Sequence, residues 1–595
     1  MAELQIYTID TFKGVNKSET ETLLELGEAS YMTNWMITDD NKLQKQFGYE
    51  RLNDPTSDKV TGIWHGQLNG NDRLLFARGG KVYEHITQWD GDIDEELGII
   101  ADSYPTTFFV TNNIVYIMDG TDLYQWDGDD FKTVAGYVPT AFTAVPPTGG
   151  GTILEGLNYL TGKKKMKFSG NGSATVFQLP ELSIGSVDKV VVGVSTKAEG
   201  PDYSVNKANG TITFVTAPPN GVNNVEVSWT KTDPEHRQLI TKCKHYGGQY
   251  YARFWIYGNP DQKNTRFCSG VTMAGVSDPT YWPMYTESDV GEHEITAITT
   301  QYDKQLIWTT GDSGGASAWY STSETYIDSN SGIMGTLFPV FPINAKVGNM
   351  APGQVQIILN NPFTIWKGVY QWVSTYVMNE KNAEWISKRI QRDLDPLDLT
   401  KAITWDWDDK GLYLLCIGKK VWVYNYRVDA WYILDLPHEP TCFMTVGKKL
   451  LFGTTDGQIM RFSEDIPTYD GEIIEADWHM GFYHFGAEWL RKFVQRVFVS
   501  ILPLVSTHVD VTFQTDMRDV NDIIKARYKL SSFDDWDFSD FSFETNYSPQ
   551  PFKFKIRAKK IDYFKLKISN KGTDGAVVLS ITLPVRIGGE VKNRS

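Results

Sequence analysis

The stretch IWHGQLNGNDRLLFARGGKVYEHI, residues 63–86, decides the expected fold. Three runs rich in aromatic and aliphatic residues, Ile63–Leu68, Arg73–Arg78 and Lys81–Ile86, are separated only by Asn-Gly-Asn-Asp and Gly-Gly. Asn and Gly tolerate the positive φ angles of tight turns, and runs of this length suit a half-buried pleated surface. The stretch therefore predicts three antiparallel strands joined by hairpin turns.

The same unit recurs along most of the chain. Its later copies are Thr107–Val110 with Ile114–Met118 and Leu123–Trp126; Gln249–Ile256; Ile295–Thr299 with Gln305–Thr309 and Ala316–Tyr320; Gln354–Leu359 with Phe363–Trp366 and Val369–Val373; Lys401–Asp406 with Leu412–Ile417, Val421–Tyr426 and Ala430–Leu434; and Cys442–Val446 with Lys449–Gly453 and Gln458–Arg461. Spacings of roughly 40 to 60 residues approach those of propeller blades. Small sheets hide both faces by packing radially, which favours an all-β chain built on a β-propeller of about six or seven blades. One or two large sandwiches are the alternative.

One region interrupts this rhythm. Ala144–Gly151 (AVPPTGGG) is typical of a linker. Lys163–Lys165 is typical of a solvated loop. Phe168–Thr230 contains short strands broken by Asn-Gly turns at 209–210 and 220–221. Its expected strands include Lys189–Val194, Tyr203–Val205, Thr211–Val215 and Val225–Trp229. Insertions are best tolerated at exposed loop tips, so we expect a small β-sandwich that projects from the propeller as a fin.

The C-terminal part changes to longer strands. They are Val494–Leu502, His508–Gln514, Phe552–Arg557, Tyr563–Ile568 and Ala576–Leu583, which predict a C-terminal β-sandwich. In Phe552–Arg557 apolar and cationic residues alternate, which gives one core face and one basic face. Aromatic and acidic residues interleave in Phe533–Glu544 (FDDWDFSDFSFE), and these two segments either meet across a subunit boundary or are a solvated strand face and a solvated loop. Short helices are expected at Asn382–Leu394 and Glu488–Arg496.

Four regions follow from these patterns. We expect an N-terminal segment with the first blades at 1–143, the inserted sandwich at 144–232, the remaining blades at 233–484, and a C-terminal sandwich or platform at 485–595. A chain of 595 residues is long enough for several domains.

Charge and composition narrow the classes of function. The net charge is −16, whereas proteins that grip nucleic acid need a basic surface to release counterions. A weakly repulsive wall nevertheless suits a channel through which DNA slides. We find no signal peptide and no run near the roughly 18 apolar residues that span a bilayer. The four cysteines form no C-x-x-C pair, which fits buried thiols in a reducing cytoplasm.

Motifs of catalysis lack their context. Gly311–Gly315 (GDSGG) is the string around a trypsin-like serine nucleophile, but no histidine upstream has the expected setting, so we expect a hairpin turn. The acidic runs Asp90–Glu95 and Asp127–Asp130 depart from calcium-loop spacing and predict Asp-Gly turns. His479 and His484 have no carboxylate or cysteine at metal-ligand spacing. We therefore predict no enzyme activity, and no catalytic, cofactor-binding or metal residue.

Several stretches resemble the tail nozzle, or stabilisation, proteins of short-tailed bacteriophages. The residues that carry the likeness are Phe12-Lys-Gly-Val-Asn-Lys-Ser-Glu19, Leu26-Gly-Glu-Ala-Ser-Tyr-Met-Thr-Asn34, Gln46-Phe-Gly-Tyr49, Val347-Gly-Asn-Met-Ala-Pro352, Phe363-Thr-Ile-Trp-Lys-Gly-Val-Tyr370 and Trp385-Ile-Ser-Lys-Arg-Ile390. The inserted Phe168–Trp229 is similar to a small sandwich common in phage tail proteins. No counterpart of the acidic-aromatic segment is identified.

The resemblance implies a structural protein of the virion tail, assembled in the host cytoplasm. Six copies would form a ring around a DNA channel, between the portal or adaptor above and fibres or a spike below. Such a ring retains the packaged genome and lets it leave, without sequence-specific contact to the DNA. A tail protein that binds a host glycan is the alternative function. A propeller hydrolase is disfavoured because Ser-x-Asp-x-Gly-x-x-Trp boxes are missing.

Overall fold

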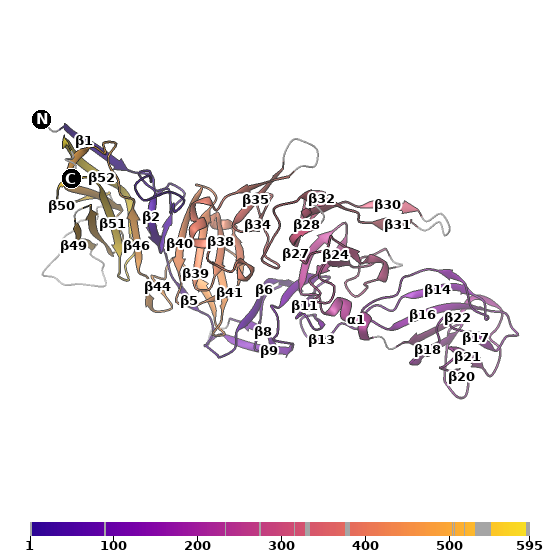
Figure 1. Cartoon of the computed structure of the whole chain (residues 1–595). Coiled ribbons are helices and arrows are strands. Elements are labelled where there is room, and N and C mark those ends of the chain that lie inside the picture. Colours follow the sequence, from indigo (N-terminus) through magenta and orange to yellow (C-terminus); the bar gives the residue numbers. More distant parts are fainter. Residues whose placement is uncertain are drawn as a thin grey trace.

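Strands dominate the computed structural model, which describes residues 3–87, 91–231, 234–272, 275–313, 316–327, 334–374, 381–502, 504, 506–516, 518–529 and 549–590. The chain is all-β and consists of many small antiparallel sheets. Figure 1 shows an elongated molecule with a pair of sheets holding both termini at one end and the inserted sheets at the other. The small sheets with the recurring pattern lie between these two ends.

Residues 63–86 fold as predicted. It forms β6 (Val60–Leu68), β7 (Asn71–Arg78) and β8 (Lys81–Ile86), and β9 (Ile93–Ile99) adds a fourth strand. At the first turn Asn69 has a φ of 52°, the left-handed conformation that Asn adopts more readily than most residues. We call a sheet of this up-and-down order a meander.

Six more sheets contain the same meander. Their strands are β10 (Thr107–Thr111), β11 (Ile114–Met118), β12 (Leu123–Trp126) and β13 (Phe131–Thr133); β23 (His245–Tyr250), β24 (Arg253–Tyr257), β25 (Thr265–Cys268) and β26 (Ser288–Asp289); β27 (Ile295–Gln301), β28 (Lys304–Ser313), β29 (Ala316–Ser321) and β32 (Val340–Asn344); β33 (Gln356–Ile358), β34 (Asn361–Ile365), β35 (Val369–Ser374) and β36 (Lys381–Trp385); β37 (Ile403–Trp407), β38 (Leu412–Ile417), β39 (Lys420–Asn425) and β40 (Ala430–Asp435); and β41 (Pro440–Val446), β42 (Lys449–Thr454) and β43 (Ile459–Phe462) with β5 (Tyr49–Arg51). Between β29 and β32, β30 (Glu324–Ile327) and β31 (Met334–Leu337) form a separate two-stranded sheet. In the last sheet β44 (Thr468–Tyr469) and β45 (Glu472–Ile473) continue beyond β5.

Hydrogen bonds join each meander to the next along the chain. They are Thr106 N to Thr61 O (3.0 Å), Thr107 Oγ1 to Lys244 O (2.8 Å), Thr300 Oγ1 to Gln249 O (3.3 Å), Gly353 N to Thr296 O (2.7 Å), Thr404 N to Gln354 Oε1 (2.7 Å) and Trp405 Nε1 to Thr445 Oγ1 (2.8 Å). Most of these atoms lie on or beside the first strand of a meander. The first strands therefore stand next to one another in sequence order.

The last meander also packs against the first. Val60, Ile63 and Phe76 share one buried cluster with Leu451 and Ile459. Arg78 Nη1 donates to Gly457 O at 3.0 Å across the same boundary. The last and the first meander are therefore in direct contact.

The inserted region forms two sheets with a core of their own. One sheet contains β14 (Thr140–Val145), β15 (Thr152–Ile153), β16 (Lys163–Gly170), β18 (Ser186–Val192), β19 (Ser195–Lys197) and β22 (Gly221–Thr230), and the other contains β17 (Val176–Gln178), β20 (Tyr203–Asn206) and β21 (Thr211–Phe214). Phe168, Phe214 and Trp229 belong to the buried cluster between the sheets. The prediction of a solvated loop at Lys163–Lys165 is wrong, because these residues begin β16 and buried Lys164 pairs with Glu181.

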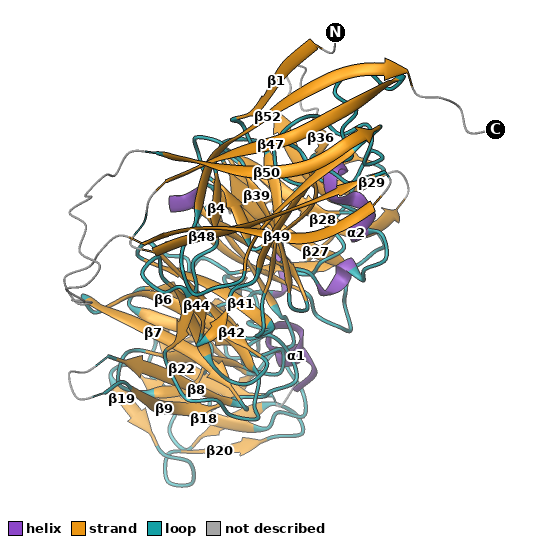
Figure 2. Cartoon of the chain, turned by 90° about the vertical axis from the view of Figure 1, so that its left-hand side faces the viewer, coloured by secondary structure: helices purple, strands orange, loops and turns teal. Residues whose placement is uncertain are grey.

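The terminal sheets combine both ends of the chain (Figure 2). The first contains β1 (Glu3–Ile9), β3 (Trp35–Ile37), β4 (Leu43–Lys45), β47 (Leu490–Leu502), β50 (Gln550–Ile561) and β52 (Val577–Glu590), and the second contains β2 (Ala29–Thr33), β46 (Ala476–Met480), β48 (Ser506–Thr515), β49 (Arg518–Lys529) and β51 (Phe564–Asn570). Sequence analysis placed the N-terminal segment with the first blades. The structure instead pairs its first strand, β1, with the last strand, β52.

Three local predictions are corrected. Asn382–Leu394 is not one helix, because β36 occupies its start and only a 3-10 turn (Lys388–Ile390) and α2 (Gln391–Leu394) follow. Glu488–Arg496 falls mainly in strand β47, where residues alternate between core and surface. The copy of the unit expected at Gln249–Ile256 covers only the end of β23, a turn at Tyr251 and Ala252 with positive φ, and most of β24. The other helical segments are α1 (Pro234–Thr241) and 3-10 turns at Met284–Thr286, Leu399–Lys401 and Asp408–Lys410.

Candidate functional site: the junction and the basic face

The serine-protease-like string lies at the end of a hairpin. Gly311 to Ser313 end β28, and Ser313 is in register with Ala316 at the start of β29. Gly314 and Gly315 lie outside the described residues. The described part of the string therefore belongs to a strand of the fourth meander, and the predicted turn itself falls on residues outside the described ones.

The first acidic run supports a buried histidine. His85 Nδ1 lies 2.9 Å from Asp94 Oδ1, and its Nε2 lies 3.5 Å from Asp92 Oδ2. Arg78 Nη2 lies 3.7 Å from the same Asp94. These carboxylates balance charge between strands of the first meander, a role that their spacing in sequence did not reveal.

The second acidic run is a turn. Asp127 Oδ1 accepts hydrogen bonds from the backbone nitrogens of Asp129 (3.1 Å) and Asp130 (2.8 Å), which lowers the pKa of the Asp127 carboxyl. This Asx turn connects β12 with β13 and matches the expected Asp-Gly turn.

The two flagged histidines have separate surroundings. The ring of His479 lies 5.0 Å from that of Tyr31, and burial lowers its pKa to about 4. His484 Nδ1 accepts from Gly486 N at 3.1 Å, and its Nε2 lies 3.9 Å from Glu488. Across the described ranges, no group of three or more His, Cys, Asp or Glu side chains could hold a metal ion.

The cysteines are free thiols. Cys243, Cys268 and Cys416 are buried, and Cys442 is half-buried. Burial raises the pKa of Cys268 and of Cys442 to about 11, so both thiols resist ionisation. None of the helices in the described part of the chain has the length and apolar character needed to cross a bilayer.

The N-terminal motif residues form a junction between the terminal sheets and the last two meanders. We define this junction by Gly14, Asn34, Gly48 and Tyr49. Asn34 is 5% exposed and has a φ of 55°. Its Nδ2 donates to Glu475 O at 2.8 Å, and its Oδ1 accepts from Asp435 N at 2.9 Å and from the Tyr469 hydroxyl at 3.3 Å. One side chain thus holds three separate segments together.

Two glycines of the junction permit close backbone contact. A Cβ on Gly14 would meet the carbonyl oxygen of Trp431, which accepts a hydrogen bond from Val15 N at 2.7 Å. A Cβ on Gly48 would meet the carbonyl oxygen of Thr468. Beside it the Tyr49 ring stacks on Tyr469 with centroids 4.8 Å apart. Residues other than glycine would push the N-terminal segment away from the meanders.

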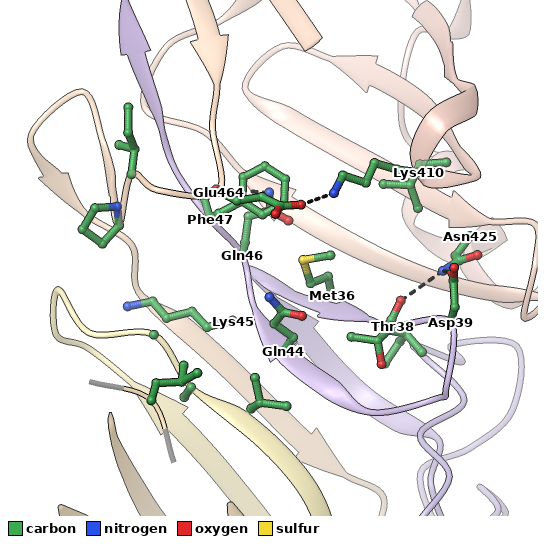
Figure 3. Close-up of a pocket in the computed structure, with 18 of the residues that line it drawn as sticks. Met36, Thr38, Asp39, Gln44, Lys45, Gln46, Phe47, Lys410, Asn425 and Glu464 are labelled. Carbon is green, nitrogen blue, oxygen red and sulfur yellow. Dashed lines mark hydrogen bonds and ion pairs between the residues drawn. The ribbon is translucent and has the colours of Figure 1, made fainter. Parts of the chain in front are cut away.

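A polar cleft of about 750 Å³ opens at the junction (Figure 3). Its walls come from the N-terminal segment, the sixth meander, the loop after β43 and the C-terminal part of the chain. Ion pairs cross it between Lys410 and Glu464 and between Arg427 and Asp39 (2.8 Å). These ion pairs connect separate parts of the chain across the cleft, as at an interface between domains.

Lys45 is the buried cation of this cleft. Its Nζ donates to Asn570 Oδ1 (2.9 Å), Gly572 O (2.6 Å) and Asp574 O (3.3 Å). Burial lowers its pKa to about 8, although the nearby Asp574 carboxylate opposes this shift. The ammonium group therefore holds the loop before β52 to the N-terminal strand β4.

A second candidate surface lies on the outer side of the first terminal sheet. The strands β1, β52, β47 and β50 lie side by side there (Figure 2). Two continuous cross-strand rows are Leu4, Arg586, Phe493 and Lys559, and Thr8, Thr582, Phe498 and Lys553. Between them, the register between β47 and β52 is irregular, and a third row contains the pairs Ile6 with Pro584 and Arg496 with Lys555. We call these residues the basic face.

The basic face combines apolar side chains with unbalanced positive charge. Leu4 and Ile6 are 55% and 68% exposed. Lys553, Lys555 and Arg586 are exposed, and none of the residues in the three rows is acidic. Among the described residues, no carboxylate forms an ion pair with any cation of this face.

Sequence analysis found only part of this face. The alternation in Phe552–Arg557 correctly placed Phe554 and Ile556 in the core and Lys553 and Lys555 on the surface. Arg496, Arg586, Leu4 and Ile6 join them through strand pairing between distant segments, for which no local signal exists. The acidic-aromatic Phe533–Glu544 lies outside the described residues.

No protein-family model and no curated protein matches the chain. Among solved structures, the chain is similar to BamB from Moraxella catarrhalis with a TM-score of 0.30 and 8% identity, over 68% of this chain and 83% of that one. It is also similar to the computationally designed Ika8 protein with a TM-score of 0.29 and 9% identity, over 69% and 99% of the two chains. Likenesses at this level carry no argument about fold or function.

Proposed function

We propose that the chain is a structural subunit of the tail nozzle of a short-tailed phage, with its seven meanders closed into a β-propeller. The observation that carries the fold proposal is the cyclic order of contacts, in which each first strand adjoins the next and the last meander packs on the first. Strand β5, from the N-terminal part of the chain, completes the last meander by pairing with β43. A strand from the N-terminal part that completes the last blade closes a propeller, because it joins distant parts of the chain in one sheet.

The residues that carry the resemblance to phage tail proteins support the tail assignment, because they hold separate segments of the chain together. Gly14, Asn34 and Gly48 fix the junction, as described above. Asn349 is fully buried, donates to Ala351 O at 2.6 Å and accepts from Ile365 N at 3.0 Å. Ser387 Oγ accepts from Val369 N at 2.8 Å. Motif residues with such roles stabilise the fold, as expected for the motifs of a structural protein.

In the proposed assembly six copies form a ring between the portal or adaptor and the fibres or spike. The lumen between copies admits duplex DNA, which requires a width of about 20 Å. The net charge of −16 suits a wall that lets DNA pass without binding. The terminal sheets and the inserted sheets, at opposite ends of the subunit, contact the neighbouring tail proteins.

Depletion of the chain from infected cells tests this function. We expect capsids that package DNA and then lose it, because the channel below the portal stays open. Restoring the chain in trans should return DNA-filled, infectious particles. The glycan-binding alternative predicts DNA-filled particles that fail to adsorb, and this result would contradict a nozzle.

A further inference from the structure

The basic face carries positive charges that lack ion-pair partners among the described residues, in a protein whose net charge is −16. Its five cations are Arg496, Lys553, Lys555, Lys559 and Arg586. Neighbouring strands lie about 4.8 Å apart, so the cross-strand cations repel one another until anions approach. Phe493 and Phe498, half-buried, lie between them. Together these residues fit an acidic partner that also carries aromatic side chains.

The chain itself contains such a partner. Segment 533–544 (FDDWDFSDFSFE) has five acidic and five aromatic residues and no Lys or Arg. Its sequence alternates aromatic and acidic residues almost one by one. An extended peptide of this composition can pair its carboxylates with the cations while its rings cover Phe493, Phe498, Leu4 and Ile6.

We propose that the basic face of one copy docks segment 533–544 of the neighbouring copy, and that this contact links subunits in the ring. The inference rests on the proposed ring, because it assigns the contact that builds it. A ring of identical copies needs two different, complementary surfaces on each chain. This chain carries both surfaces, with opposite charges and shared apolar character.

The reach of the segment is sufficient for contact between copies. Twenty residues separate Lys529, the end of β49, from Gln550, the start of β50, and an extended chain of that length spans about 65 Å. Strands β49 and β50 are edge strands of the two terminal sheets. The two ends of this span, Lys529 and Gln550, thus lie on edge strands, and Gln550 shares β50 with Lys553 and Lys555 of the basic face. A chain of this length can reach the same face of a neighbouring copy.

A peptide experiment tests the docking surface. Residues 531–546 are replaced in the full chain by a Gly-Ser linker of equal length, and a fluorescent peptide of the native residues is titrated. We expect saturable binding that weakens as salt rises from about 0.05 to about 0.3 M. The double variant Lys553→Glu and Lys555→Glu should weaken binding by roughly tenfold or more. Absence of saturable binding would overturn the proposal.

A matched control separates the face from general charge. The double variant Lys419→Glu and Lys420→Glu reverses two exposed cations at the start of β39, outside the basic face. Binding of the peptide should be unchanged in this variant. An equal loss in the control and in the face variant would overturn the proposal, because it would show attraction without a defined site.

Photo-crosslinking decides which copy is bound. A photoreactive phenylalanine at position 538 of the full chain should give a product of twice the mass, linked to β47 or β50 of the other copy. Links confined to the same chain would overturn docking between copies. Rings that persist while the peptide fails to bind would refute this contact and leave the nozzle standing. A different outcome would refute the nozzle and support the contact. In it the peptide binds and crosslinks form between copies, but particles made without the chain still retain their DNA.

Discussion

The inserted sheets and the terminal sheets are both appended to the meanders, yet they are attached in different ways. The inserted sheets enclose a separate core, with Phe168, Phe177 and Trp229 among its members. The terminal sheets share one continuous core with the later meanders, in which Trp478 of β46 and Trp431 of β40 both take part. A shared core makes two bodies one cooperative unit, whereas a separate core permits independent unfolding.

Large deletions should show this difference most strongly. Gly162 O accepts a hydrogen bond from Lys231 N at 3.1 Å, so residues 163–230 can be replaced by a short Gly linker with little displacement of the ends. We expect the remaining chain to be folded, with an unchanged main thermal transition. Removal of residues 485–595 should leave no cooperatively folded protein, as measured by calorimetry. A folded product in the second case would contradict the shared core.

Two tryptophan substitutions sharpen the same comparison. Trp478→Ala should lower the free energy of unfolding of the main body by about 3–5 kcal/mol, the usual range for a buried Trp. Trp229→Ala should destabilise the inserted sheets by a similar amount and leave the main transition in place. Both side chains are fully buried, which makes them matched. Denaturant unfolding followed by hydrogen exchange assigns each loss to its region, and a shift of both regions by Trp229→Ala would refute independence.

The junction should be sensitive at a single asparagine. Asn34→Ala removes three side-chain hydrogen bonds and places Ala at a φ of 55°. We expect a loss of about 2–4 kcal/mol in the free energy of unfolding. Asn113→Ala is the control, since Asn113 has a φ of 57° and is exposed in the turn between β10 and β11. It should cost about 1 kcal/mol, and equal losses would show that backbone strain alone matters.

Acid should weaken the main body before the inserted sheets. Burial lowers the pKa of His245 and of His479 from 6.5 to about 4. The unfolded chain binds protons at these sites below pH 6.5 and the folded chain only near pH 4, so the free energy of unfolding falls as pH drops through this window. Residues 140–231 contain no histidine. The double variant His245→Gln and His479→Gln should flatten the pH dependence of the main transition between pH 6.5 and 5, and an unchanged slope would contradict this account.

Turn chemistry made the meanders predictable from sequence. Asn69-Gly70 and Gly79-Gly80 fix hairpins between strands adjacent in sequence, so local signals suffice. The same reasoning gave no turn signal within Gln249–Ile256, where Tyr251 and Ala252 turn without Gly, Asn or Pro. It also failed at Asn382–Leu394, where a capping residue and helical spacing compete with pairing to β35.

Pairing between distant segments lay beyond sequence analysis. Neither the pairing of β1 with β52 nor that of β5 with β43 has a local signature, because the partner of each strand lies hundreds of residues away. The basic face could not be predicted in full for the same reason, since its rows combine residues from both ends of the chain. The structural roles of Gly14, Asn34 and Gly48 likewise depend on backbone that approaches from elsewhere.

Imaging the tail of the intact particle by cryo-electron microscopy, with this chain traced into the density, tests the central claim most directly. The account predicts six copies around an open lumen, each with seven meanders about one axis and β5 completing the last. An open arc of sheets, or a peripheral position away from the DNA path, would contradict it.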